Sequence, residues 1–146
     1  MNTPEPSADL ADDGPPVAAS LTRTLGALGA ASLVGGGLVA MRSSNSTARA
    51  FGQQTAAWGA INVAIAGVGA WRAGTHPARA AQLRRTLLVN AGLDVFYVAA
   101  GAHLAHHRST LGGRVTQDAA RGHGMAVVGQ GLALLALDLT YARRLA

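Results

Sequence analysis

The chain of 146 residues contains no cysteine and no lysine, and only 13% of its residues are charged. Without cysteine there is no disulfide framework, thiolate metal site or thiol nucleophile. About a quarter of the residues in an average soluble domain are charged, so half of the usual polar surface is missing. Aromatic residues are also sparse, at 4%. These shortages argue against an ordinary soluble domain.

Apolar residues make up 49% of the chain, and there are 19 glycines. Glycine is more frequent in membrane helices than in soluble ones. All twelve basic residues are arginine, and they lie between apolar segments. That placement suits loops beside anionic lipid headgroups better than a nucleic-acid groove. We therefore expect the lipid bilayer as a partner and no nucleic acid.

Four apolar stretches are long enough to cross a bilayer as helices. We predict these spans at about residues 24–41, 51–71, 86–105 and 123–142. Residues 1–20 combine four acids with four prolines and predict a disordered tail, which leaves residues 21–146 as the membrane domain. The tail lacks a basic segment followed by an apolar run, so we expect no cleaved signal peptide.

The four spans predict an all-α fold, a four-transmembrane-helix bundle. Gly52 and Gly59 recur 72 residues later as Gly124 and Gly131, which is typical of two parallel hairpin repeats. An even number of spans places both termini on one side of the membrane. Seven arginines flank that side and five flank the other, which favours cytoplasmic termini in a multi-pass protein of the bacterial inner membrane.

Polar side chains interrupt the apolar spans. Asn90, Asp94 and Tyr97 share one face of the third predicted helix. A carboxylate in the bilayer is costly unless it is paired, protonated or turned toward a protein interior. We predict an intramembrane polar cluster of Asn62, Asn90, Asp94, Tyr97, Gln130 and Asp138. Two interpretations stay open: a proton, cation or small-ligand site, and hydrogen bonds that hold the helices together.

Histidines gather at the end of the third span and the start of the fourth, at positions 103, 106, 107 and 123. Imidazoles are ligands for zinc and copper, which makes His103, His106, His107 and His123 a conceivable metal site. Their spacing matches no established ligand signature, so we expect no metal and no other cofactor. The chain also lacks a P-loop and a nucleophile elbow, and we expect no enzymatic activity.

The stretches LLVNAGLDVFYVAAG and GHGMAVVGQGLALLALDLTYA resemble an uncharacterised family of small bacterial four-helix membrane proteins, a domain of unknown function. The resemblance covers about residues 21–141 and implies the four-span fold but no activity. The acidic tail and the histidine-rich connector lie outside the pattern. The matching positions are Trp58, Asn62, Asn90, Gly92, Leu93, Asp94, Tyr97, Gly122, Gly124, Gln130, Gly131 and Asp138.

Small-residue stripes along the spans favour close helix packing. We therefore expect a structural or accessory component that self-associates as a homo-oligomer or joins a larger membrane complex. The alternative is a transporter-like or proton- or cation-handling protein that uses the polar cluster around Asp94.

Overall fold

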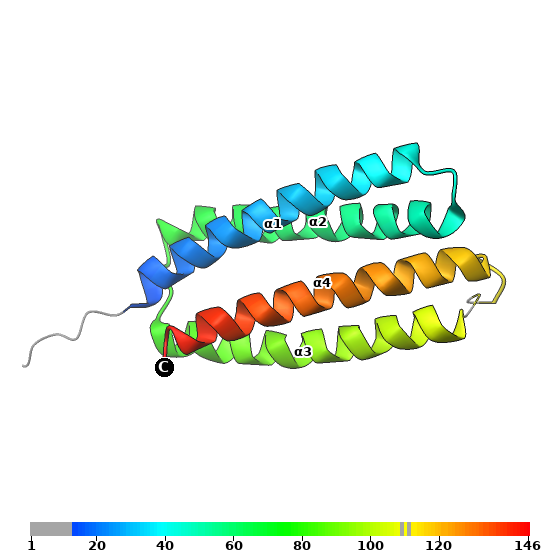
Figure 1. The fold of residues 1–146 in the computed structure, drawn as a ribbon. Coiled ribbons are helices and arrows are strands. Elements are labelled where there is room, and N and C mark those ends of the chain that lie inside the picture. Colours follow the sequence, from blue (N-terminus) through cyan, green and yellow to red (C-terminus); the bar gives the residue numbers. More distant parts are fainter. Residues whose placement is uncertain (1–12, 109, 111) are drawn as a thin grey trace, which may run out of the picture.

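The computed structural model describes residues 13–108, 110 and 112–146, and every regular element within them is an α-helix. The helices are α1 (Gly14–Arg42), α2 (Ser46–Ala73), α3 (Ala80–His107) and α4 (Gln117–Arg143) (Figure 1). The all-helical prediction is confirmed. Each of the four predicted apolar stretches lies inside one of these helices.

The predicted disordered tail of residues 1–20 is wrong for its last part. Residues 14–20 form the first turns of α1, whereas residues 1–12 lie outside the described residues. Pro15 and Pro16 lie in the first turn, where a missing N–H breaks no intrahelical bond and a fixed φ suits the helix. Val17 then packs against the hydrophobic core, and this tertiary contact stabilises the extra turns.

Local signals in the connectors set the helix ends. Asn45 and Thr116 accept hydrogen bonds from the backbone N–H three residues on, which caps α2 and α4. Helix α3 ends at His107, and the next residue, Arg108, has a left-handed backbone with φ 47°. Gly112 and Gly113 in the same connector have positive φ, which glycine adopts without strain.

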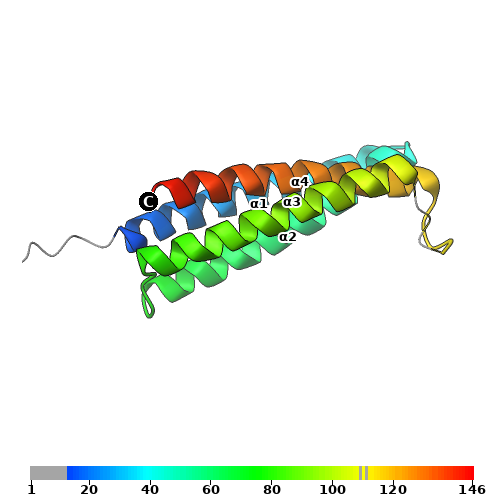
Figure 2. The same cartoon turned by 90° about the horizontal axis from the view of Figure 1, so that it is seen from below.

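The helices form two hairpins, α1–α2 and α3–α4, that point in the same direction (Figures 1 and 2). The α1–α2 and α3–α4 connectors lie at one end of the molecule, which we call the connector end. The start of α1, the C-terminus and the α2–α3 connector lie at the other end, which we call the terminal end. Within each hairpin the two helices pack along their length, and α2 packs against α4.

Glycines bring the two backbones of the first hairpin into direct contact. A Cβ built on Gly36 would lie 2.7 Å from the carbonyl oxygen of Gly52. One built on Gly59 would lie 2.6 Å from the carbonyl oxygen of Gly29. No side chain fits at these positions, so the pairing of α1 with α2 depends on glycine.

The second hairpin repeats this arrangement. A Cβ on Gly124 would lie 2.5 Å from the carbonyl oxygen of Gly101, and one on Gly131 would lie 3.3 Å from the α3 backbone. These two glycines are the counterparts of Gly52 and Gly59 at the 72-residue offset. Matching positions in the two hairpins therefore make matching backbone contacts.

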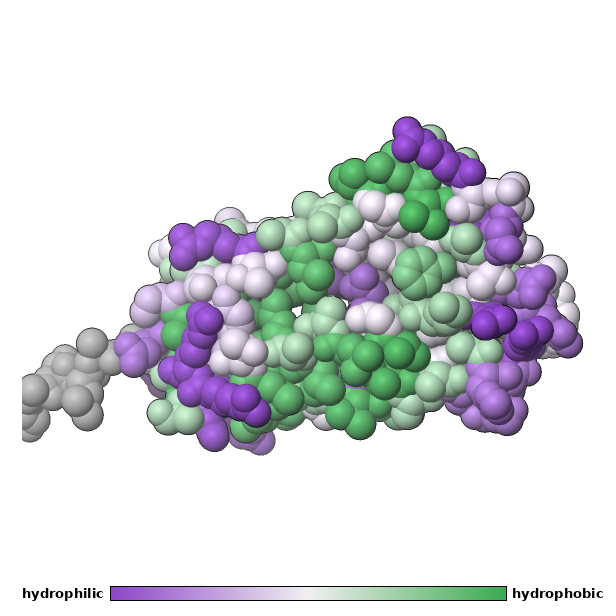
Figure 3. Space-filling model, viewed as in Figure 1, coloured by the Kyte–Doolittle hydropathy of each residue, from purple (hydrophilic) through white to green (hydrophobic). Residues whose placement is uncertain are grey.

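Large apolar side chains mostly face outward. Val34, Trp71 and Phe96 are each more than 60% exposed, and green apolar surface covers much of both hairpins in Figure 3. Helices α1, α3 and α4 are long and apolar enough to cross a membrane. Helix α2 is not among them, because polar residues such as Gln53 and Asn62 lower its hydropathy.

The inward-facing apolar core is small and lies at the terminal end. Leu87 of α3 packs there with Leu137, Tyr141 and Ala142 of α4. Val17, Leu21, Leu83 and Leu145 surround this cluster. At the connector end, small residues such as Ala120 and Gly122 bring α4 against the start of α2. The two hairpins thus touch at both ends.

We predict that Gly59→Ala destabilises the first hairpin, whereas Gly67→Ala on the same helix does not. A methyl group at Gly59 overlaps the α1 backbone, while nothing lies within 4 Å of the Cβ position at Gly67. Overpacking of this kind costs about 1–3 kcal/mol. Thermal unfolding of the protein in mild detergent, followed by circular dichroism, measures the difference. Equal stability of the two variants would contradict the backbone contact.

Candidate functional site

Five polar side chains are buried among the described residues, and four of them lie on α2, α3 and α4. Asn62 of α2 is 2% exposed, Asp94 of α3 4%, and Gln130 and Asp138 of α4 8% and 7%. Burying a polar group is costly unless it finds a partner. Their presence in a chain with so few polar residues therefore makes this interior the candidate functional site. All four belong to the predicted polar cluster.

The two carboxyl groups of the site lie near each other. Asp94 on α3 is close enough to Asp138 on α4 for an electrostatic interaction, and the Asn90 amide donates a hydrogen bond to the Asp138 carboxyl group. Asn90 itself is largely exposed, because it lies at the edge of the α3–α4 contact. These three predicted cluster residues are thus brought together by the second hairpin alone.

Gln130 connects the two hairpins. Its Nε2 donates a hydrogen bond of 3.0 Å to the Ser32 hydroxyl of α1. Ser32 is buried and is not a member of the predicted polar cluster. A signal was present, since Ser32 lies between Gly29 and Gly36 on the face of α1 that packs against α2.

Two further hydrogen-bond groups lie toward the ends of the helices. At the connector end, His123 Nδ1 is 3.1 Å from Gln54 Oε1 of α2, beside a cleft of about 380 Å³. At the terminal end, the Tyr141 hydroxyl is 3.0 Å from the Ser20 hydroxyl and 2.8 Å from the Thr24 hydroxyl of α1. Each of these contacts joins α4 to the first hairpin, as the Gln130 contact does.

Together these residues form a polar column that follows α4 between the hairpins. Figure 3 shows a hollow with small openings between the two hairpins in the same region. The polar column consists of Gln54, His123, Ser32, Asn62, Gln130, Asp94, Asn90, Asp138, Tyr141, Ser20 and Thr24.

Several buried polar atoms of the interior have no hydrogen-bond partner among the described residues. Asn62 Nδ2 and Trp58 Nε1 are donors, Asp94 Oδ2 and Gln130 Oε1 are acceptors, and the Thr55 hydroxyl is both. Leaving such an atom unsatisfied costs about 1–3 kcal/mol. Trp58 and Thr55 were not in the predicted cluster. Their atoms face the interior because α2 places them on the same side as Asn62.

Tyr97, the remaining predicted cluster residue, lies at the margin of the site. Its side chain is 37% exposed, and its ring packs edge-on against Trp58 with the ring centroids 5.4 Å apart. This contact joins α3 to α2 across the two hairpins. Tyr97 therefore borders the polar column.

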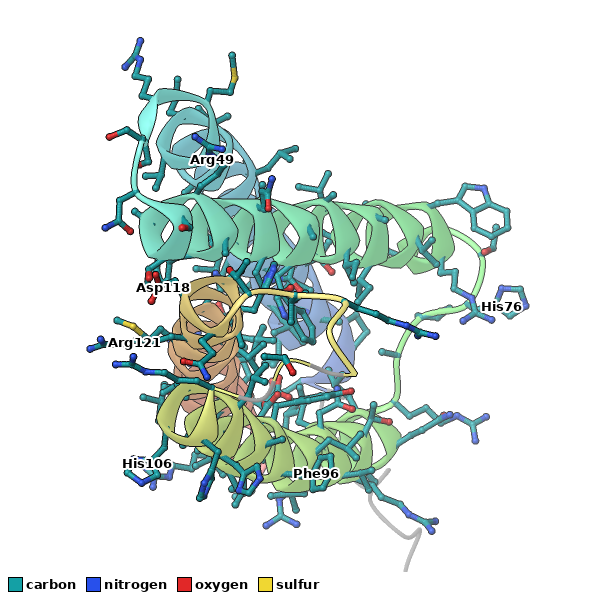
Figure 4. All side chains as sticks on the ribbon, turned by 90° about the vertical axis from the view of Figure 1, so that its right-hand side faces the viewer. Arg49, His76, Phe96, His106, Asp118 and Arg121 are labelled. Atoms are coloured by element: carbon teal, nitrogen blue, oxygen red, sulfur yellow. The ribbon has the colours of Figure 1, made fainter. Side chains whose placement is uncertain are left out.

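The four histidines do not converge. His103 and His106 each pack against His107, with ring centroids 4.3 Å and 4.9 Å apart, whereas His123 bonds to Gln54. Figure 4 shows His106 pointing away from the helices. Within the part of the chain that is described, no group of three or more histidine and acidic side chains is arranged to hold a metal ion.

These features define the class of the protein: an all-helical chain whose apolar helices resemble membrane spans. The chain belongs to a family of unknown function, DUF6992, whose family model matches residues 24–139. The predicted resemblance to an uncharacterised family is thereby confirmed. No curated protein and no solved structure matches the chain.

Proposed function

We propose that the chain is a multi-pass protein of the bacterial inner membrane that spans the bilayer four times, with both termini in the cytoplasm. Helix α2 has 28 residues, which exceeds the length needed for a span. Its outer face carries Ile61, Ile65 and Val68, each at least half exposed. Of the polar residues that lower its hydropathy, Gln54 and Asn62 belong to the polar column, whereas Gln53 is exposed. An apolar outside with a polar inside is the pattern of a membrane helix that lines an interior site.

Within this membrane protein, we propose that the polar column conducts protons. The observation that supports this role is the set of unpartnered polar atoms buried at mid-column. Hydrogen-bond groups follow α4 from His123 to Tyr141, a distance of 18 residues. At a rise of about 1.5 Å per residue this is roughly 27 Å, close to the thickness of the hydrocarbon core.

The kinds of atoms in the column favour protons over metal cations. Hard cations bind oxygen ligands. The unpartnered atoms here include the N–H groups of Asn62 and Trp58, which repel a cation. Mixed donors and acceptors are what bridging water molecules need, because each water makes two to four hydrogen bonds. Two carboxyl groups, Asp94 and Asp138, can exchange protons with such a chain.

A purely structural role explains the column less well. Polar residues that only hold helices together are paired with each other, and their hydrogen bonds average about 0.6 kcal/mol in membranes. Here Asn62 Nδ2 and Asp94 Oδ2 have no partner among the described residues. These unpaired polar groups lower the stability of the fold and form no hydrogen bond that would hold the helices together. Proteins carry such a cost mainly at functional sites.

We predict that Asp94→Asn reduces proton flux to the rate of protein-free liposomes. The amide keeps the shape of the carboxyl group but exchanges no proton at neutral pH. The measurement uses the full chain in liposomes with a pH-sensitive dye inside and a potassium diffusion potential. Asp118→Asn is the matched control, since Asp118 is exposed in the first turn of α4 and lies outside the column.

The same variants distinguish proton conduction from a purely structural role of Asp94. Conduction predicts that Asp94→Asn keeps its thermal stability in detergent while flux is lost. A structural role predicts lower stability for Asp94→Asn and no wild-type flux above background. Wild-type flux that Asp94→Asn leaves unchanged would also refute the proposal.

Self-association or a place in a larger membrane complex is the second candidate function. Gly35 and Gly37 of α1, Gly92 of α3 and Gly129 of α4 have no atom within 4 Å of their Cβ positions. Such open small-residue positions permit the close approach of another helix in the membrane. We predict that cross-linking in native membranes yields a dimer or higher oligomer, and that Gly92→Leu weakens it. Recovery of monomer alone from wild type would count against self-association.

A further inference from the structure

A second cleft opens between α1 and α4 at the terminal end, where it shares Thr24 and Tyr141 with the polar column. Its volume is about 470 Å³, within the range of about 300–1,000 Å³ typical of small-molecule sites. Leu28 of α1 and Ala133 and Ala136 of α4 form an apolar part. Thr24, Tyr141 and Arg144 form a polar part near the end of the helices. The cleft is therefore amphipathic along its length.

The length of the cleft matches one leaflet of a bilayer. From Ala133 to Arg144 is 11 residues, or roughly 16 Å at a rise of about 1.5 Å per residue. Half of the hydrocarbon core is about 15 Å. An acyl chain that lies along the apolar part thus places its headgroup beside Arg144.

The charge at the mouth of the cleft is positive and fixed in position. The Arg144 guanidinium lies 4.6 Å from the centroid of the Tyr141 ring, a cation–π contact. The Tyr141 hydroxyl is held by Ser20 and Thr24, so the ring under the guanidinium is itself anchored. This arrangement complements a phosphate group.

We propose that this cleft binds one anionic phospholipid of the surrounding bilayer, with its phosphate at Arg144 and an acyl chain along Leu28 and Ala133. The inference rests on the proposed membrane location and is independent of proton conduction. Basic sites between transmembrane helices on the cytoplasmic side recognise anionic headgroups in this way.

The test is native mass spectrometry of the full chain released from nanodiscs that contain equal amounts of phosphatidylglycerol and phosphatidylcholine. Wild type retains one phosphatidylglycerol in preference to phosphatidylcholine. Arg144→Gln lowers that retention about fivefold, the effect expected for one arginine at a membrane surface. Arg143→Gln is the matched control, because Arg143 is exposed at the same end but does not line the cleft.

A second pair of variants tests the apolar part without changing charge. Ala133→Leu fills the cleft and lowers retention, whereas Ala99→Leu on the exposed side of α3 leaves it unchanged. Equal retention of the two lipids by wild type overturns the proposal. So does an equal loss in Arg143→Gln and Arg144→Gln, wild-type retention in Ala133→Leu, or displacement of the lipid by inorganic phosphate.

The same experiment distinguishes a wrong lipid site from a wrong membrane location. A chain that does not enter nanodiscs at all contradicts the membrane location. A chain that enters them and shows no preference between the lipids contradicts only the lipid site. Circular dichroism of each variant confirms that its helices are intact before retention is compared.

Discussion

The close approach of helix backbones at glycine is the constraint on which the rest of this structure depends. Gly36 meets Gly52, and Gly101 meets Gly124, with no room for a side chain between the helices. Interlocking side chains are therefore not needed inside either hairpin. The large apolar side chains are free to face outward, where the bilayer that we propose around the helices supplies their apolar surroundings.

The contacts between the two hairpins differ from the backbone contacts within each hairpin. The hairpins meet through a small apolar cluster around Leu137 at one end and through small residues such as Ala120 at the other. The middle is left to polar groups such as Gln130 of α4, which bonds to the first hairpin. Helix α4 also supplies His123 and Tyr141 to partners on the first hairpin, toward the two ends. In a low-dielectric interior such groups interact strongly when paired and are costly when unpaired. The pairing is incomplete at Asn62 and Asp94, and that incompleteness is what favours conduction over a structural role.

The sequence predicts what depends on local pattern. Apolar length and flanking arginines identify all four helices, and the 72-residue glycine offset anticipates the matching contacts of the two hairpins. Asp94 and Gln130 are recognisable because they interrupt apolar stretches. Their partners are not, because the bond from Gln130 to Ser32 depends on how α4 is rotated against the first hairpin. The start of α1 was missed for a similar reason, since contacts distant in sequence order its proline-containing first turn.

The most direct test concerns the location of α2, because α2 is the described helix that is not among the three apolar enough to cross a membrane, yet it carries much of the proposed interior. The chain has no native cysteine, so single cysteines report their own accessibility. In intact cells, a membrane-impermeant maleimide should label Ser44→Cys in the α1–α2 connector and leave Ile65→Cys unlabelled. In inverted membranes both should stay unlabelled until detergent is added. Labelling of Ile65→Cys as fast as Ser44→Cys in intact membranes would contradict a membrane-spanning α2.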